Sequence, residues 1–423
     1  MNETRLAPWL SASQWPTAPI RLVARLGSGH TPSRNKAEYW ENCTIPWVTL
    51  ADVWQLRSGL KSIITETKDK ISQLGMANSS AVKHPAGTVI LSRTASVGFS
   101  AIMGRDMATS QDFATWTCGP QLDSRYLLHA LRGMAPDLKR IAMGSTHKTI
   151  YMPDIEQLRV PLPPLGEQRR ISDFLDAQTA RIDALSGLRQ SQIGLVQERL
   201  ESIIYRELDE SGAPEVELRR LGVAVTTGPF GTVFSASEYK EGGVPMVNPL
   251  HIRDGQILPD LHHAVSPATA ARLARHRLRA GDLVVGRKGD LGRAALVRDH
   301  QDGWVCGSDC IAVHPGGRLQ PHFLDFVLRS QYVRSQLLAK SLAATMPSLN
   351  EQNLLSLRIP HLTLKQQGTI AARLDCVHKW VVSVTSAMRR QLDLLAEHRQ
   401  ALITAAVTGQ FDVSTASGRG VTE

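Results

Sequence analysis

The sequence PLPPLGEQRRISDFLDAQTARIDAL, residues 161–185, marks the start of a long regular segment. Its three prolines end any element that precedes them, because proline interrupts both helices and central strands. From Glu167 to about Leu208 the chain has no proline, and its apolar residues recur at spacings of three and four. This periodicity predicts one long helix with a single apolar stripe.

The pattern returns 199 residues later, where LRIP at residues 357–360 matches LRVP at residues 158–161. A second helix with a heptad-like stripe is predicted to follow and to end at Gly409. A helix of ~40 residues is ~60 Å long, which is too long to bury its stripe in one small domain. We therefore expect the two helices to pair as an antiparallel intramolecular coiled coil, related by a pseudo-two-fold axis. The side chains predicted to pair the helices are Ile171, Leu175, Ile182, Leu185, Val196, Leu200, Ile370, Leu374, Val377, Val381, Val384, Met388 and Leu395.

The blocks that precede the two helices are also similar to each other. GTVILSRTASVG at residues 87–98 parallels GDLVVGRKGDLG at residues 281–292, and each predicts a short buried strand followed by a turn. The fold class predicted is α+β, with two mixed α/β domains in tandem, separated by the helices. The predicted boundaries are a first domain at 1–158, a first helical spacer at 159–209, a second domain at 210–357, a second spacer at 358–413 and a polar tail at 414–423.

Charge is distributed unevenly along the 423 residues. The net charge is +9, but residues 161–210 hold six basic and nine acidic residues, so the positive excess falls mostly in the two domains. A basic balance of this kind favours nucleic acid as a partner. No apolar run reaches the ~18–20 residues of a membrane span, and the five cysteines are scattered, so we expect a cytoplasmic protein with reduced thiols.

Motifs that carry catalysis are not recognisable in the sequence. It contains no phosphate-binding GxxxxGK loop, no GxSxG elbow and no HExxH. Residues 248–251 read NPLH, which lacks the second proline and the aromatic residue of an amino-methyltransferase motif, and Glu66-Thr67-Lys68 is a lone ExK. We therefore predict no catalytic residue and no metal ligand. Two alternatives stay open: a non-catalytic coiled-coil scaffold, and a fused methyltransferase-nuclease with an unrecognised site.

The duplicated segments resemble the conserved regions of type I restriction-modification specificity subunits. In that family an IPLPPLxEQxxI stretch opens each long helix, as at residues 160–171 here, and RQALIxxAVTG ends the last one, as at residues 399–409. LGSGHTPSR at residues 26–34 and GSTHKTI at residues 144–150 resemble early and late segments of the family's target-recognition domains. The second half departs from these patterns, with PHLTLKQQGTI at the helix entry, TTGPFGTVF at residues 226–234 and Ala-Ala-Thr at residues 343–345.

The resemblance implies a subunit without catalytic activity of its own. Each recognition domain would read one half of a bipartite, asymmetric DNA target, and the helices would fix the gap and dock two methylation subunits. Those subunits would use S-adenosylmethionine to methylate adenine at N6. Restriction subunits would use ATP and Mg²⁺ to translocate and cleave double-stranded DNA, while this chain binds no cofactor.

Base edges in the major groove are read by donors and acceptors on protruding loops, with arginine favoured for guanine and amides for adenine. The residues expected to contact DNA in the first domain are Ser28, His30, Thr31, Arg34, Asn35, Lys36, Arg93, His147 and Lys148. In the second domain they are Thr227, Phe230, Asn248, Arg287, Lys288 and Arg293.

Overall fold

The computed structural model describes residues 8–57, 59, 61–143, 148–258, 260–288, 292–341 and 349–414. The chain divides into two compact units. Unit 1 comprises residues 1–190 and 389–423, and unit 2 comprises residues 191–388. Each unit combines one globular domain with parts of two long helices, α6 (Leu165–Asp209) and α11 (Leu364–Thr408).

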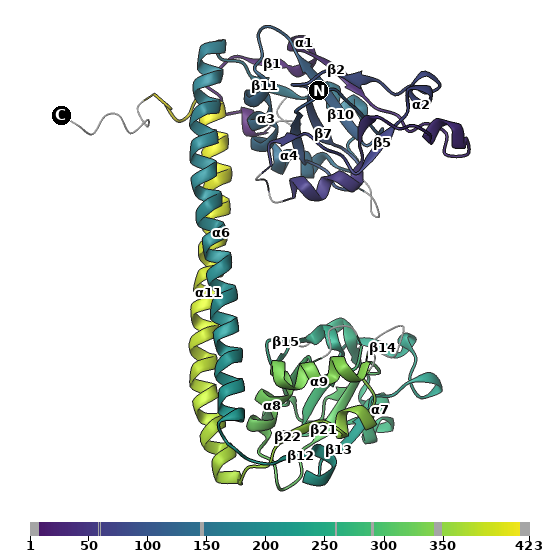
Figure 1. The fold of residues 1–423 in the computed structure, drawn as a ribbon, viewed down its shortest axis with the longest axis vertical. Coiled ribbons are helices and arrows are strands. Elements are labelled where there is room, and N and C mark those ends of the chain that lie inside the picture. The colour runs from purple at the N-terminus through teal and green to yellow at the C-terminus, as the bar shows by residue number, and fades with distance from the viewer. Residues whose placement is uncertain are drawn as a thin grey trace, which may run out of the picture. The chain divides into compact units, whose positions relative to one another are not determined.

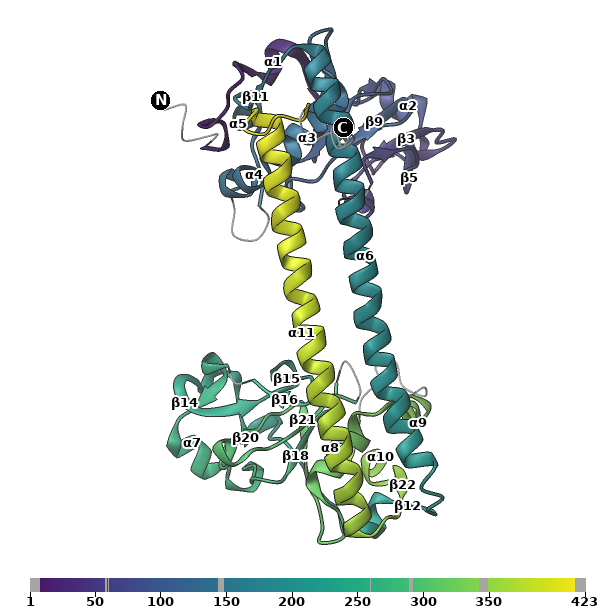
Figure 2. The same cartoon turned by 90° about the vertical axis from the view of Figure 1, so that its left-hand side faces the viewer.

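The two long helices run antiparallel within each unit (Figures 1 and 2). In unit 1 the start of α6 lies beside the end of α11, where Arg399 pairs with Asp183 at 3.0 Å. In unit 2 the end of α6 lies beside the start of α11, where Arg373 pairs with Glu207 at 3.1 Å. The predicted α+β class with paired antiparallel helices is thus confirmed. Gly409 closes α11 with a φ of 78°, a backbone conformation that glycine adopts readily.

Twelve of the thirteen side chains expected to pair the helices are buried or half-buried. Ile171 and Leu175 pack with Ile403 into the core of the unit 1 domain, so the helix pair and the domain share one core. The exception is Leu185, which is 52% exposed. It lies three residues after Ile182, about 60° around the helix, and this rotation places it at the flank of the stripe.

Unit 1 contains two sheets and a short ribbon within its described residues. The strand order of the first sheet is β2 (Ala24–Ser28), β10 (Phe113–Cys118), β7 (Val89–Ser92), β8 (Ser100–Met103) and β4 (Ile63–Ile64). The second has the order β5 (Asp69–Ile71), β3 (Ile45–Val48), β9 (Met107–Thr109) and β6 (Lys83–His84). The ribbon pairs β1 (Thr17–Pro19) with β11 (Arg159–Pro161). The helices of this domain are α1 (Ile20–Val23), α2 (Gln73–Ala77), α3 (Ser124–Gly133), α4 (Ala135–Ile141) and α5 (Met152–Glu156).

Unit 2 repeats this plan with smaller sheets. Its first sheet has the order β13 (Ala224–Thr227), β21 (Cys310–His314), β18 (Leu283–Gly286) and β19 (Ala294–Leu296). Its second sheet has the order β17 (Ala264–Val265), β14 (Tyr239–Val247) and β20 (Val305–Cys306). Two ribbons pair β15 (Ile252–Arg253) with β16 (Gln256–Ile257), and β12 (Glu215–Glu217) with β22 (Arg358–Pro360). The helices are α7 (Pro267–Arg272), α8 (Pro321–Arg329), α9 (Gln331–Ser341) and α10 (Glu351–Leu355).

The predicted strands of the repeat lie at the centre of these sheets. β7 and β18 are buried at every position, as expected for short apolar runs bounded by turns. Trp47 in β3 and Met246 in β14 occupy equivalent positions, since both strands pair in parallel with the strand that follows in their sheet, β9 or β20. The two domains are therefore copies of one fold in secondary structure as well as in sequence.

A buried glutamine attaches each domain to its long helix. Gln168 near the start of α6 accepts a hydrogen bond from the Asp123 N–H at 2.9 Å and donates to the carbonyls of Gln121 and Pro163, each at 2.9 Å. Gln367 in α11 repeats this arrangement, accepting from the Gln320 N–H at 2.8 Å. These contacts explain the glutamine of the EQ and QQ sequences at the two helix entries.

Unit 1 is assembled from both terminal portions of the described chain. The Gln14 N–H donates to the carbonyl of Thr408 at the end of α11, and the amide of Gln410 donates to the carbonyl of Ala12. Phe174 and Phe411 pack with their ring centroids 5.5 Å apart. Residues 389–414 thus complete a domain that begins almost 400 residues earlier in the chain.

Among the described residues, no helix combines the length and the apolar character needed to cross a membrane. The predicted domain boundaries at 158, 209, 357 and 413 stay predictions, because the two units divide within the long helices.

Candidate nucleic-acid interface

A glycine near the start of each domain makes a close backbone approach that admits no side chain. A Cβ atom on Gly29 would collide with the carbonyl oxygen of Thr109, and one on Gly228 would collide with the carbonyl oxygen of Gly307. The loop after β2 therefore lies against the end of β9. In unit 2 the loop after β13 lies against the segment between β20 and β21. The sequence repeat at these two glycines therefore has a steric cause.

In unit 1 this contact gathers four segments, residues 28–31, 93–95, 109–112 and 148–150, which we call the unit 1 loop cluster. The Thr31 hydroxyl donates to Gln111 Oε1 at 2.7 Å. The Arg93 N–H donates to the Asp112 carbonyl, and the Ile150 N–H donates to the Arg93 carbonyl, both at 2.8 Å.

The side chains of this cluster differ in how freely they face solvent. His30 and Lys148 are exposed, whereas Arg93 is half-buried and donates from Nη1 to the Ile150 carbonyl at 3.4 Å. The Ser28 hydroxyl donates to the Phe113 carbonyl at 2.8 Å. The backbone is therefore well fixed, while the exposed histidine and lysine remain accessible to a ligand.

Unit 2 builds the same cluster from residues 227–230, 287–288, 307–310 and 349–351, the unit 2 loop cluster. The Arg287 N–H donates to the Asp309 carbonyl at 2.9 Å, and the Leu349 N–H donates to the Arg287 carbonyl at 2.8 Å, as at Arg93 in unit 1. Lys288 is exposed and pairs with the Asp309 carboxylate at 2.8 Å. Glu351 accepts from the N–H and the hydroxyl of Thr227, at 3.0 and 2.7 Å.

Several members of the two clusters carry no signal in the sequence. Gln111, Asp309 and Glu351 each contribute a polar group to these clusters. They lie on short loops and helix starts, and the residues they contact are about 20–125 positions away. The repeat at an offset of 199 residues places Glu351 opposite Met152, which is not polar, so it does not point to these residues either.

Three further candidates of unit 1 lie beside the second sheet. Arg34 stacks on the Trp40 ring at 5.1 Å, and Lys36 Nζ lies 3.1 Å from the Tyr39 hydroxyl; this hydrogen bond raises the pKa of Lys36. Asn35 between them is exposed. His147, the 144–147 part of the GSTHKTI segment, and residues 343–345 lie outside the described residues.

Two candidates of unit 2 lie outside the four segments of its loop cluster, although Asn248 packs against Gly307, a residue of that cluster. Asn248 is only 9% exposed and its side-chain amide donates to the Tyr239 hydroxyl at 3.1 Å, so it stabilises the core and is turned away from solvent. Arg293 is exposed but lines a separate cavity of about 630 Å³ with Arg253 and Arg329.

A histidine outside the unit 2 loop cluster forms a hydrogen bond with its first segment. His276 Nδ1 donates to the Thr227 carbonyl at 3.0 Å, and burial lowers the pKa of this histidine. The neutral ring is therefore favoured at neutral pH, and the cations of the cluster are Arg287 and Lys288. A cavity of about 500 Å³ opens beside them and is also lined by Phe230 and Asp309.

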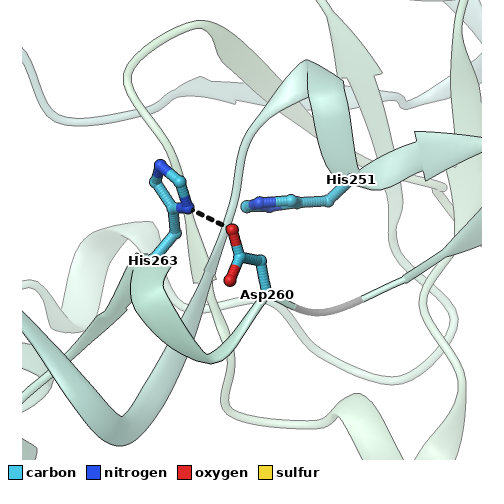
Figure 3. Close-up of side chains that lie close together, drawn as sticks. All are labelled: His251, Asp260 and His263. Carbon is cyan, nitrogen blue, oxygen red and sulfur yellow. Dashed lines mark hydrogen bonds and ion pairs between the residues drawn. The ribbon is translucent and has the colours of Figure 1, made fainter. Parts of the chain in front are cut away.

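Within the described residues, one group of side chains lies close enough to share a metal ion (Figure 3). The ligand atoms of His251, Asp260 and His263 all lie within 4.8 Å of one another. The Asn248 N–H, however, donates to His251 Nδ1 at 3.0 Å, so the neutral ring carries its proton on Nε2, the nitrogen that a metal would need. His263 Nδ1 is hydrogen-bonded to Asp260 at 2.6 Å. The arrangement fits a hydrogen-bonded cluster better than a metal centre.

Two comparisons of the sequence with known proteins point to the same family. Residues 13–193 match the model of the type I restriction modification DNA specificity domain. A stretch of 201 residues, 46% of the chain, is 24% identical to the specificity subunit of the type I restriction enzyme EcoR124I/EcoR124II of Escherichia coli. This stretch spans 47% of that relative, less than half of its length. The EcoBI specificity subunit of Escherichia coli is 22% identical over 316 residues, which cover 68% of this chain and 66% of the relative.

The fold agrees with these matches. A chain from a solved structure of the type I R-M system, described for its complex assembly and conformational transition, superposes with a TM-score of 0.70. The superposition covers 94% of this chain and 98% of the other at 19% identity, so it concerns the fold alone. Together, these findings confirm the resemblance seen in the sequence. The chain is similar to the specificity subunits of type I restriction enzymes, and its residues 13–193 match the model of the type I restriction modification DNA specificity domain.

Proposed function

We propose that this chain is the DNA-recognition subunit of a type I restriction-modification complex, in which each unit reads one half of a bipartite, asymmetric target. The observation that carries this proposal is the loop cluster, built twice from equivalent segments around Gly29 and Gly228. Each cluster has a fixed backbone and presents exposed basic side chains, Lys148 in unit 1 and Lys288 in unit 2. Fixed loops with accessible donors are what reading base edges requires.

The long helices would act as the spacer between the half-sites and as the docking surface for two methylation subunits. Most of the buried stripe faces the partner helix or the domain cores, so docking would use the outer face of the helices. Leu188 and Leu195 of α6 and Leu394 of α11 are each more than 60% exposed and belong to that face.

The chemistry of the complex would reside in the other subunits. Methylation subunits would transfer a methyl group from S-adenosylmethionine to adenine N6, and restriction subunits would use ATP and Mg²⁺ to translocate and cut double-stranded DNA. This chain would bind no cofactor and supply no catalytic group. Its contribution would be the choice of the DNA sequence.

Methylation mapping in cells tests the proposal directly. We expect cells that carry this chain and its methylation subunits to show N6-methyladenine at a split motif, lost when the chain is deleted. Replacing residues 1–158 with the corresponding domain of another relative should change one half of the motif and leave the other half. A change in both halves, or in neither, would contradict the assignment of one half-site to each unit.

The salt dependence of DNA binding distinguishes this function from that of a coiled-coil scaffold. Removing one lysine that contacts a phosphate reduces the magnitude of the slope of log K against log salt by about 1. We expect Lys288→Ala to lower the slope in this way. Lys379→Ala is the matched control, because Lys379 forms a similar exposed pair with Asp375 on α11. Binding that does not respond to salt at all would favour the scaffold.

A further inference from the structure

Phe230 is an aromatic side chain that the fold holds out in solvent. It is 65% exposed, although phenylalanine side chains are usually buried. It lies in the sequence GPFG, between Gly228, which is wedged against Gly307, and Gly231, whose φ is 66°. The two glycines thus set the conformation of the loop, and the Phe230 ring between them is exposed to solvent.

The backbone on both sides of Phe230 is anchored. The Gly228 N–H donates to the Cys310 carbonyl at 3.0 Å, and the Thr227 carbonyl accepts from His276 at 3.0 Å. On the other side, Arg272 Nη1 donates to the Val233 carbonyl at 2.7 Å. Because these contacts already fix the loop, inserting the ring into a ligand would require little further ordering of the backbone.

The surroundings of the ring favour a nucleic acid over an apolar protein surface. The neighbouring cavity of about 500 Å³ is lined by Arg287, Lys288 and Asp309 as well as by Phe230. Two cations beside an exposed aromatic ring suit a base stack flanked by phosphates. A protein partner would have to desolvate these charges in order to cover the ring.

We propose that Phe230 is a wedge that inserts between adjacent base pairs of the half-site read by unit 2. The inference rests on the proposed function and adds a mode of recognition to it. Apolar wedges unstack a base step and kink the duplex, which makes binding depend on how easily that step deforms. Unit 2 would then select its half-site partly through the flexibility of one step, including bases it does not contact.

The repeat supplies an internal comparison for this wedge. Counting from the paired glycines Gly29 and Gly228, the position of Phe230 corresponds to Thr31 in unit 1. The Thr31 hydroxyl is bound to Gln111 and is too short to separate base pairs. This position therefore distorts DNA in unit 2 and not in unit 1.

The test measures base stacking across the target found by methylation mapping. The full chain with its methylation subunits is bound to duplexes that carry 2-aminopurine at single adenine positions or are probed with permanganate at thymines. Both probes respond to unstacked bases. We expect an unstacked step in the unit 2 half-site, apart from the adenine that is methylated. Phe230→Ala should abolish this signal and weaken binding by roughly 10- to 100-fold.

Two further variants sharpen the outcome. Phe230→Leu should keep part of the unstacking, because leucine is also an apolar wedge. Trp54→Ala removes a similarly exposed ring, 66% exposed, outside the two loop clusters and should leave the pattern in both half-sites unchanged. The signal from the methylated adenine should persist in every variant, which shows that the complex is intact. An unchanged unit 2 pattern in Phe230→Ala would overturn the wedge while leaving the proposed function standing. Loss of a methylation subunit in Phe230→Ala would assign the ring to a protein contact instead.

Discussion

The Asp123 N–H donates a hydrogen bond to the side chain of Gln168 at 2.9 Å, and this contact joins the unit 1 domain to helix α6. Asp123 is the N-cap of α3, and its own carboxylate accepts from the N–H groups of Arg125 and Tyr126. One glutamine side chain therefore connects the start of a domain helix with the start of the long helix. The position of the domain on α6 depends on a few hydrogen bonds made by one fully buried side chain.

Replacing this glutamine should destabilise unit 1. Gln168→Ala removes three hydrogen bonds, of which the one to the Pro163 carbonyl is fully buried, and this loss should lower the free energy of unfolding by about 2–4 kcal/mol. Urea denaturation followed by tryptophan fluorescence measures the change. Gln197→Ala, at an exposed position of the same helix, is the control and should be close to neutral. Equal effects of the two variants would mean that the buried contacts contribute little.

The ion pair between Asp183 and Arg399 should be worth more than its counterpart in unit 2. Both side chains are less than 20% exposed, and Arg399 also donates to the Gly59 carbonyl at 3.2 Å. A double-mutant cycle with alanine should give a coupling energy of about 1–3 kcal/mol. In the pair of Arg373 with Glu207 the arginine is 62% exposed, so the same cycle should give no more than about 1 kcal/mol.

The stability of unit 1 should decrease as the pH falls below about 6.5. Burial lowers the pKa of His129 more than its 2.8 Å hydrogen bond with Asp176 raises it. The unfolded chain therefore takes up a proton that the folded domain excludes, and the stabilisation present above the unfolded pKa is lost on acidification.

Denaturation curves between pH 5 and 8 test this prediction. His129→Gln should reduce the pH dependence by up to about 1.4 kcal/mol per pH unit. His84, whose pKa is also lowered by burial, accounts for part of the remaining slope. The same change at the exposed His30 should leave the profile as it is. A wild-type profile that is flat over this range would show that neither histidine is linked to folding.

Replacing a glycine by alanine should raise or lower the stability according to the space around that glycine. Gly29→Ala places a methyl group against the Thr109 carbonyl and should destabilise unit 1 by about 3 kcal/mol, with loss of the half-site read by that unit. Gly187 lies in α6 with open space around its Cα, so Gly187→Ala should stabilise the helix by about 0.5–1 kcal/mol. Thermal unfolding of the two variants gives the sign of each effect. If Gly187→Ala destabilises the protein instead, other atoms must cover the surface of α6 at this position.

The sequence predicts the parts of this fold that follow from local periodicity. The stripe from Ile171 to Leu395 indicates both long helices, and the apolar runs at residues 88–91 and 282–285 indicate β7 and β18 to within one residue. The duplication then makes the tandem architecture a necessary consequence. Leu185 belongs to the apolar pattern of the sequence, but its side chain is 52% exposed, because the buried stripe of the helix is narrower than that pattern.

The loop clusters were predictable only in part. His30, Arg93, Arg287 and Lys288 stand out as polar residues next to turn signals, and the fold does bring them into the clusters. Contacts such as that between Glu351 and Thr227 join positions 124 residues apart and depend on tertiary packing, which no local pattern reports. Asn248 is also positioned by tertiary packing, because its side chain is 9% exposed and donates to the Tyr239 hydroxyl, which its local sequence does not indicate.

The discontinuity of unit 1 sets an order of events during synthesis. Unit 2 is one uninterrupted stretch, residues 191–388, so all of its core residues are synthesised before the end of α11. The unit 1 domain, although translated first, lacks Ile403, Ala406 and Val407 until then, and all three are fully buried in its core. The nascent first domain must therefore wait with one apolar face uncovered while some 200 further residues are added. During that interval it is a natural client for chaperones, and unit 2 is the first of the two to reach its native state.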